Sequence, residues 1–161
     1  MQPTATETSR RSAFKTMFAA VAAAGAGLFG LTRPARAAAS EITTFPGDTQ
    51  QPAAQPPMFS SSVVHGGLVF VAGKGEHGPG DITVHTTSVL NQLEAELKKA
   101  GSSMEKVLKV NVYLHDMRDF EGMNAVYRGR FGAKPPARST IACYGGVPGQ
   151  SLVEIDCIAA I

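Results

Sequence analysis

Two stretches of the chain place apolar residues at helical spacing. Between Thr83 and Ala100 one stripe consists of Thr86, Val89, Leu90, Leu93 and Leu97, with charged residues off the stripe and Gly101 after it. The stretch from Asp119 to Phe131 repeats the pattern through Phe120, Met123, Tyr127 and Phe131. Asp119 can cap this second helix and Gly132 can end it. Both stretches therefore predict amphipathic helices.

Shorter apolar runs predict five strands. Val63–Val64 and Leu68–Ala72 flank the pair Gly66-Gly67, which is typical of a hairpin. Residues 106–114 alternate, so we expect Val110 and Val112 on the face of Leu108 and Leu114. The remaining strands are expected at residues 138–144 and 152–160.

The resulting order, ββαβαββ, predicts an α+β domain with a single mixed sheet and two helices packed on one face. The other face of such a sheet lacks a cover. Because the strands are strongly apolar, as in L-V-F-V-A at residues 68–72, we expect another copy of the chain to cover that face.

The first 37 residues resemble an export signal. A basic head with the pair Arg10-Arg11 precedes a weakly hydrophobic run from Met17 to Leu31, and A-R-A follows at residues 35–37. This pattern predicts a cleaved twin-arginine signal at residues 1–37 and a periplasmic mature protein. An uncleaved N-terminal helix is the alternative.

Residues 38–57 are rich in Pro and Gln, which predicts a linker or irregular arm before a globular domain at residues 58–161. The whole chain has a formal net charge of +2, but five of its 15 basic residues and one of its 13 acidic residues lie in residues 1–37. The mature chain is therefore slightly acidic. We expect it to bind no nucleic acid and, once the signal is removed, no membrane.

Glycines, histidines and cysteines give little support for a phosphate-binding loop, a metal site or a disulfide. The loop G-K-G-E-H-G-P-G-D at residues 73–81 lacks the spacing of a phosphate-binding loop. The four histidines have no recognised ligand spacing, so no metal is expected. Cys143 and Cys157 both lie in predicted strands, and the sequence leaves open whether they form a disulfide.

Two charged residues in the predicted sheet are candidates for chemistry. Arg138 follows Pro135-Pro136 at the start of a strand, where a rigid guanidinium could bind a carboxylate with two hydrogen bonds. Glu154 alternates with the apolar Val153 and Ile155 in the last strand. Either residue could instead form an ordinary surface ion pair. Burial by a partner copy would favour a shared functional role for the two charges.

Three segments together carry a family resemblance: D-M-R-D-F-E-G-M-N-A-V-Y-R-G-R-F at residues 116–131, P-P-A-R-S-T at 135–140 and L-V-E-I-D-C-I-A-A at 152–160. They resemble the Rid family of small imine and enamine deaminases, also called YjgF-like proteins. The resemblance implies a chorismate-mutase-like homotrimer with clefts between subunits. It also implies that Arg138 binds the substrate carboxylate, that Glu154 activates water and that Asn124 lies near the cleft.

The chain differs from the family pattern at some positions near the expected cleft and matches it at others. A cleft tyrosine of the family is replaced by Phe59, and Thr140 stands where a cysteine or threonine follows the arginine by two residues. Lys74 replaces a glutamine and could add a positive charge to the cleft rim. These differences affect the expected choice of substrate.

The resemblance implies hydrolysis of reactive 2-imino or 2-enamino acids to 2-oxo acids and ammonia. In that reaction a fixed arginine would place the imine carbon, and a carboxylate would deprotonate the attacking water. No organic cofactor is expected, because this hydrolysis requires none. The alternative is a non-catalytic trimer that binds a small carboxylic acid in the same cleft.

Overall fold

The computed structural model describes residues 41–47 and 56–161. These residues belong to one compact unit that covers residues 40–161. The expected export signal at residues 1–37 lies outside the described residues, so its expected structure and cleavage stay predictions. None of the helices in the described ranges has the length and apolar content needed to cross a membrane.

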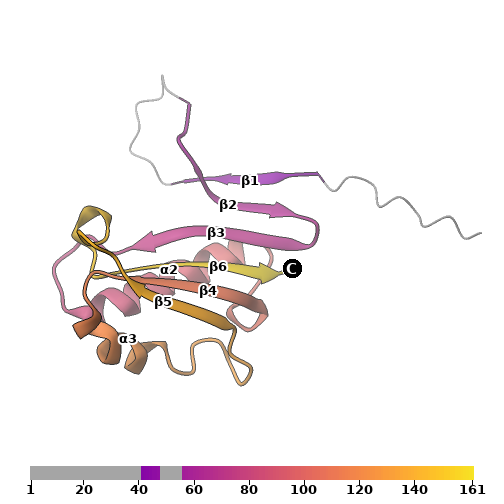
Figure 1. Ribbon diagram of the computed structural model, residues 1–161. Helices are drawn as coiled ribbons and strands as arrows, with labels where there is room; N and C mark the ends of the chain where they lie inside the picture. The colour runs from indigo at the N-terminus through magenta and orange to yellow at the C-terminus, as the bar shows by residue number, and fades with distance from the viewer. Residues whose placement is uncertain (1–40, 48–55) are drawn as a thin grey trace, which may run out of the picture. The chain divides into compact units, whose positions relative to one another are not determined.

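Six strands form one mixed sheet in the order β1-β2-β3-β6-β4-β5 (Figure 1). Their bounds are β1 Thr43–Pro46, β2 Ser60–His65, β3 Leu68–Gly75, β4 Val107–Leu114, β5 Ala137–Ala142 and β6 Val153–Ala160. Neighbouring strands are antiparallel except β4 and β5, which are parallel because a helix connects them. The predicted α+β arrangement is confirmed, and β5 lies at one edge of the sheet.

Strand β1 adds a sixth strand that the sequence did not predict. It lies within the segment expected to be a linker, and it pairs with β2 through Thr43–Val64 and Thr44–Val63. Only four residues long and mostly exposed, β1 has too few apolar side chains to produce a recognisable alternation. Its pairing supplies backbone hydrogen bonds to the outer edge of β2.

Helix α2, Ile82–Lys99, closely matches the first predicted helix. The Asp81 side chain caps its first turn by accepting a hydrogen bond from the Val84 backbone N–H at 3.0 Å. At its other end Gly101 has a φ of 82°, and the Ser102 N–H reaches back to the Leu97 carbonyl at 2.8 Å. This hydrogen bond at the helix end requires a residue with a left-handed backbone conformation, which glycine adopts readily, so Gly101 ends the helix as predicted.

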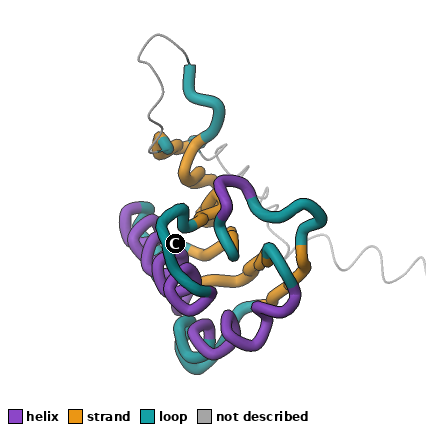
Figure 2. The backbone as a smooth tube through the Cα atoms, turned by 90° about the vertical axis from the view of Figure 1, so that its left-hand side faces the viewer, coloured by secondary structure: helices purple, strands orange, loops and turns teal. Residues whose placement is uncertain are grey.

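Helix α3, Phe120–Tyr127, is shorter than predicted. It ends at Tyr127 because Arg128 has an extended backbone and Gly129 has a φ of 79°, so Gly132 lies beyond the helix and does not end it. Asp119 makes no capping hydrogen bond with its side chain. Instead Asp116 caps the 3₁₀ turn that leads into the helix. The two helices contact each other beside the strands (Figure 2).

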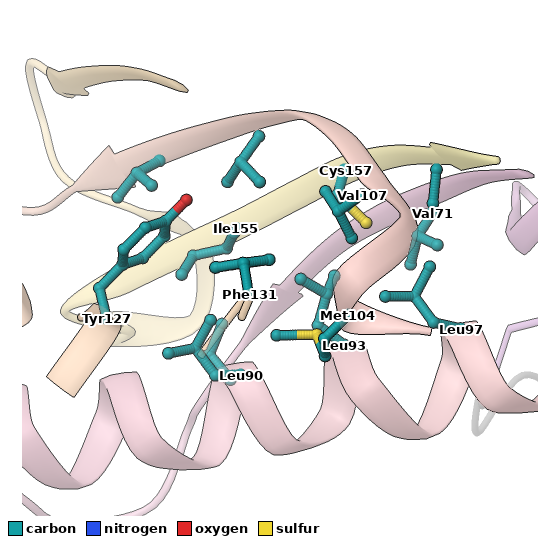
Figure 3. Close-up of a cluster of buried hydrophobic side chains, with 14 of the residues drawn as sticks. Val71, Leu90, Leu93, Leu97, Met104, Val107, Tyr127, Phe131, Ile155 and Cys157 are labelled. Carbon is teal, nitrogen blue, oxygen red and sulfur yellow. The ribbon is translucent and has the colours of Figure 1, made fainter. Parts of the chain in front are cut away.

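The core lies between the helices and one face of the sheet. Leu90, Leu93 and Leu97 point from α2 toward the strands, where they meet side chains that include Val71, Ile155 and Cys157 (Figure 3). Each fully buried side chain of this size stabilises the fold by about 1.5–3 kcal/mol. The predicted stripe on α2 is therefore the main contribution of that helix to the core.

In strand β4, one of the side chains expected to face the core does not. Val110, Val112 and Leu114 are fully buried, but Leu108 is 52% exposed. A shift in the β4–β6 register between Val107 and Lys109 reverses the alternation, so Val107 faces the core in place of Leu108.

Both cysteines are unbridged, which answers the question that the sequence left open. Cys157 faces the core, where burial and then the nearby charge of Asp156 raise the pKa of its thiol to about 12. The thiol is therefore held in its neutral form at physiological pH.

Candidate active site

Arg138 lies on the helix-covered face of the edge strand β5. It pairs in parallel register with Val110, whose side chain is fully buried against the helices. Paired residues project to the same face of a sheet, so the Arg138 side chain points toward α3. From there its Nη1 donates a hydrogen bond to the Asn124 side-chain oxygen at 2.8 Å.

Two aromatic rings of α3 also contact the Arg138 guanidinium. Its central carbon lies 4.7 Å from the centroid of the Tyr127 ring and 5.9 Å from that of Phe120. Both distances allow a cation–π interaction. Together with the bond to Asn124, these contacts hold the cation in one position.

A cavity of about 420 Å³ opens beside Arg138. It lies between α3, the turns at residues 128–135 and the start of β5, and its charged and amide-bearing lining residues are Glu121, Asn124, Arg128 and Arg138. Its size is within the range of small-molecule sites. A ligand in this cavity therefore reaches a fixed guanidinium.

Two buried hydroxyls near Arg138 have no hydrogen-bond partner within the described part of the chain. They belong to Thr140, which pairs with Val112 on the helix-covered face, and to Tyr127. Burial raises the pKa of Tyr127 to about 12, although the positive charge of Arg138 partly opposes this effect. The tyrosine therefore stays neutral beside the arginine.

Glu154 lies on the opposite face of the sheet. Its neighbours in β6, Val153 and Ile155, are fully buried in the core, whereas Glu154 pairs with Tyr113 on the face that the helices leave uncovered. The Tyr113 hydroxyl donates to Asp156 on that same face at 3.0 Å. Within one chain, the sheet separates the Glu154 carboxylate from the Arg138 cavity.

Gly73 of β3 makes room for the Glu154 carboxylate. A Cβ atom at Gly73 would overlap the end of the Glu154 side chain. The β3–β6 register also shifts between Val71 and Lys74, directly beside this contact. A glycine in an irregular part of the strand therefore fixes where the carboxylate can lie.

Phe59 and Lys74 do not join Arg138 within one chain. Phe59 precedes β2 and is 55% exposed, and three strands lie between β2 and β5 in the sheet. The Lys74 ammonium lies 3.9 Å from the buried carboxylate of Glu96. Lys74 consequently directs its charge into an internal ion pair and does not extend the cavity that contains Arg138.

The comparisons with known proteins identify the family. A family model described as Endoribonuclease L-PSP matches residues 49–161, more than two thirds of the chain. The chain belongs to the L-PSP/YjgF (Rid) family. Its six-stranded mixed sheet with two helices matches the chorismate-mutase-like fold of solved family members.

Relatives of this Rid-family chain come from distant organisms. The mitochondrial protein mmf2 of Schizosaccharomyces pombe is 40% identical over 110 residues, which cover 63% of this chain and 86% of mmf2. A RutC family protein of Pyrococcus horikoshii is 40% identical over 108 residues, 63% of this chain and 85% of that protein. The crystal structure of a YjgF-family member from Mycobacterium tuberculosis is similar with a TM-score of 0.66 and a sequence identity of 26%. The match covers 75% of this chain and all of that protein's chain.

Several residues of the Rid-family cavity were not recognised as site residues from the sequence. Phe120 and Tyr127 were expected only as core residues, yet both contact the Arg138 guanidinium. Glu121 and Arg128 were not singled out at all. Their spacing from Asn124, three positions before and four after, places all three on one side of the helix predicted over residues 119–131, and this was the available signal.

Proposed function

We propose that this Rid-family protein hydrolyses reactive 2-imino or 2-enamino acids to 2-oxo acids and ammonia. The observation that carries the proposal is the cation of Arg138, which Asn124 and two aromatic rings hold at the wall of a cavity. A 2-imino acid has a carboxylate directly beside its electrophilic carbon. Binding of the carboxylate to a fixed guanidinium therefore also positions the carbon that reacts.

Glu154 supplies the general base in this proposal. Its carboxylate takes a proton from water while the water oxygen bonds to the imine carbon, and the electron pair of the C=N bond moves to nitrogen. Glu154 then gives that proton to the nitrogen, which completes a neutral tetrahedral adduct. Its carboxylate next accepts the proton of the adduct's hydroxyl and passes it to the amino group, so that ammonia leaves as the C=O bond forms. The products are one 2-oxo acid and one ammonia for each imine and water consumed. Such base catalysis typically contributes about 10²–10⁴-fold to the rate.

The two charges can cooperate only if different copies of the chain contribute them. One copy would provide Arg138, Asn124 and Thr140 from its helix-covered edge, and the next would provide Glu154 and Phe59. The uncovered sheet face supports such an association because Phe70 and Ile141 are 41% and 55% exposed on it. A homotrimer with three shared clefts is the assembly that we propose, located in the periplasm after removal of the signal at residues 1–37.

A second function is favoured by the separation of the charges within one chain. If no partner brings a carboxylate to the Arg138 cavity, the protein can still bind a small carboxylic acid there without hydrolysing it. The binding function needs Arg138 but not Glu154. Activity measurements on variants of these two residues therefore distinguish the two functions.

The direct test is ammonia release from 2-iminopropanoate that an amino-acid oxidase generates in situ from alanine. The wild-type oligomer should accelerate the release over buffer, Arg138→Ala should abolish the acceleration, and Glu154→Gln should reduce it by about 10²-fold or more. An oligomer without any effect on the rate would exclude the enzyme and leave the binding function. Sedimentation of the same samples reports the number of chains in the assembly.

A further inference from the structure

The cavity beside Arg138 is lined by three charged side chains. Arg138 enters from β5, whereas Glu121 and Arg128 enter from α3 and the residue that ends it. Glu121 and Arg128 are both exposed to solvent, and the cavity forms part of the surface that they share. The lining therefore carries two positive charges and one negative charge.

These three charges are not neutralised by one another or by other groups. Across residues 41–47 and 56–161, neither the Glu121 side chain nor the Arg128 side chain forms an ion pair or a hydrogen bond, and the polar partner of Arg138 is the neutral amide of Asn124. The nearby Arg130 differs in this respect. Arg130 contacts Asn91 at 2.8 Å and Glu94 at 3.6 Å, so its guanidinium is already occupied.

A ligand that complements this lining has two anionic groups and one cationic group. A 2-imino dicarboxylic acid with a protonated imine has these charges, with the cationic nitrogen beside one of its two carboxylates. Guanidinium groups bind carboxylates through paired hydrogen bonds, and a carboxylate accepts hydrogen bonds from an iminium N–H. A monocarboxylic imine would leave one of the two arginines without a partner.

We propose that the preferred substrates are the 2-imino dicarboxylic acids that correspond to acidic amino acids. Arg138 binds the carboxylate beside the imine carbon, Arg128 binds the distal carboxylate and Glu121 accepts a hydrogen bond from the imine nitrogen. This assignment rests on the proposed hydrolysis, and the reaction that it specifies is the same addition of water and loss of ammonia, with a 2-oxo dicarboxylate as product. Arg128 is the residue that sets the preference.

Competing substrates test this assignment. 2-Iminoglutarate can be generated in situ by glutamate oxidase and 2-iminopropanoate by an alanine-oxidising enzyme, and the remaining imine can be trapped with semicarbazide. The wild-type kcat/KM should be about ten-fold or more higher for the dicarboxylate, because one additional charge-assisted contact forms. Arg128→Gln should lower the ratio of the two kcat/KM values by a similar factor.

Arg130→Gln is the matched control. It removes the same charge two residues away, from a guanidinium that does not line the cavity, so it should leave the substrate ratio unchanged. Calorimetry adds a readout that does not depend on turnover. Wild-type protein should bind 2-oxoglutarate about ten-fold or more tightly than 2-oxobutanoate, and Arg128→Gln should remove the difference.

The outcomes separate this assignment from the proposed function. Hydrolysis of 2-iminopropanoate with no preference for the dicarboxylate, or a preference that survives in Arg128→Gln, would overturn the role of Arg128 and leave the deaminase proposal intact. Hydrolysis of neither imine would remove the deaminase proposal and this substrate assignment together.

Discussion

The Arg138 guanidinium donates to the Asn124 side-chain oxygen at 2.8 Å, so the edge strand β5 and helix α3 jointly fix one cation. The Tyr127 ring, one helical turn further along α3, lies 4.7 Å from the same guanidinium. A planar guanidinium can donate to an amide from its edge while its face lies over a ring. The shape of the arginine therefore matters here as well as its charge.

Replacing Arg138 by lysine tests this dependence on shape. Arg138→Lys keeps the positive charge but removes the planar fork, so we expect kcat/KM for 2-iminopropanoate to fall by about 10²-fold. Steady-state ammonia release measures the change. Arg118→Lys is the control, since Arg118 is exposed, pairs with Asp116 at 2.7 Å and does not line the cavity. A lysine variant with near wild-type activity would contradict the proposed two-point binding of the carboxylate.

A mixing experiment tests whether each site is shared between copies. Arg138→Ala and Glu154→Gln variants should each be nearly inactive. When they are unfolded together and refolded at equal amounts, roughly a quarter of the shared sites receive an intact arginine from one copy and an intact glutamate from another. Ammonia release should then recover toward a quarter of the wild-type rate. Recovery would be absent if both groups had to come from the same chain.

The expected export signal gives a prediction about localisation. Substituting lysine for both Arg10 and Arg11 should block twin-arginine transport and keep the full-length chain in the cytoplasm. Cell fractionation followed by intact-mass measurement checks this, with wild-type protein expected in the periplasm and beginning at Ala38. Periplasmic protein of full length would show instead that the first 37 residues are not removed.

The sequence predicted the layout of the elements well because their signals are local. The stripe from Thr86 to Leu97 and the glycine after it are enough to predict α2 from its own residues. Strand β1 was missed for the opposite reason. Its place in the sheet depends on pairing with β2, and a four-residue exposed strand carries no periodic pattern of its own.

The candidate site was predictable in its residues but not in its geometry. Arg138 and Glu154 were both singled out, yet alternation within each strand cannot show which face of the sheet a charged residue occupies. Register decides that, and the register shifts beside Leu108 and Gly73 cannot be read from residue types. The charges of Glu121 and Arg128 became relevant only when the structure placed them around one cavity.

Gly73 offers a way to displace Glu154 without removing it. In Gly73→Ala the new methyl group would overlap the end of the Glu154 side chain, which can turn away because it is flexible. We expect kcat to fall by about ten-fold or more while KM changes little, since the arginine that binds substrate is untouched. The control is Gly75→Ala in the same strand, where the added methyl makes only ordinary contacts at 3.4 Å. Equal losses in both variants would indicate a general distortion of β3.

The buried carboxylate of Glu96 should make stability depend on pH. Burial tends to raise its pKa, but hydrogen bonds from Ser61 at 2.5 Å and Ser62 at 2.8 Å, together with the charges of Lys74 and Lys99, lower it below the ordinary value of 4.5. A carboxylate with a lowered pKa in the folded state stabilises the fold above its ordinary pKa. That stabilisation is lost as the pH falls through the lowered value.

Glu96→Gln isolates this contribution. At pH 7 the variant should have a free energy of unfolding about 1–3 kcal/mol below wild type, because a charged hydrogen-bond acceptor becomes a neutral amide. The difference should shrink as the pH falls below the ordinary carboxyl value of 4.5 and through the lowered pKa of Glu96, because the wild-type carboxylate then also becomes neutral. Urea unfolding at fixed protein concentration measures the difference in free energy of unfolding.

Glu94→Gln is the control. The Glu94 side chain is 36% exposed, so its ion pairs with Lys98 and Arg130 should contribute less than about 1 kcal/mol. A Glu96→Gln difference that stays constant from pH 7 to pH 3 would mean that the ionised carboxylate does not stabilise the contact between α2 and β2.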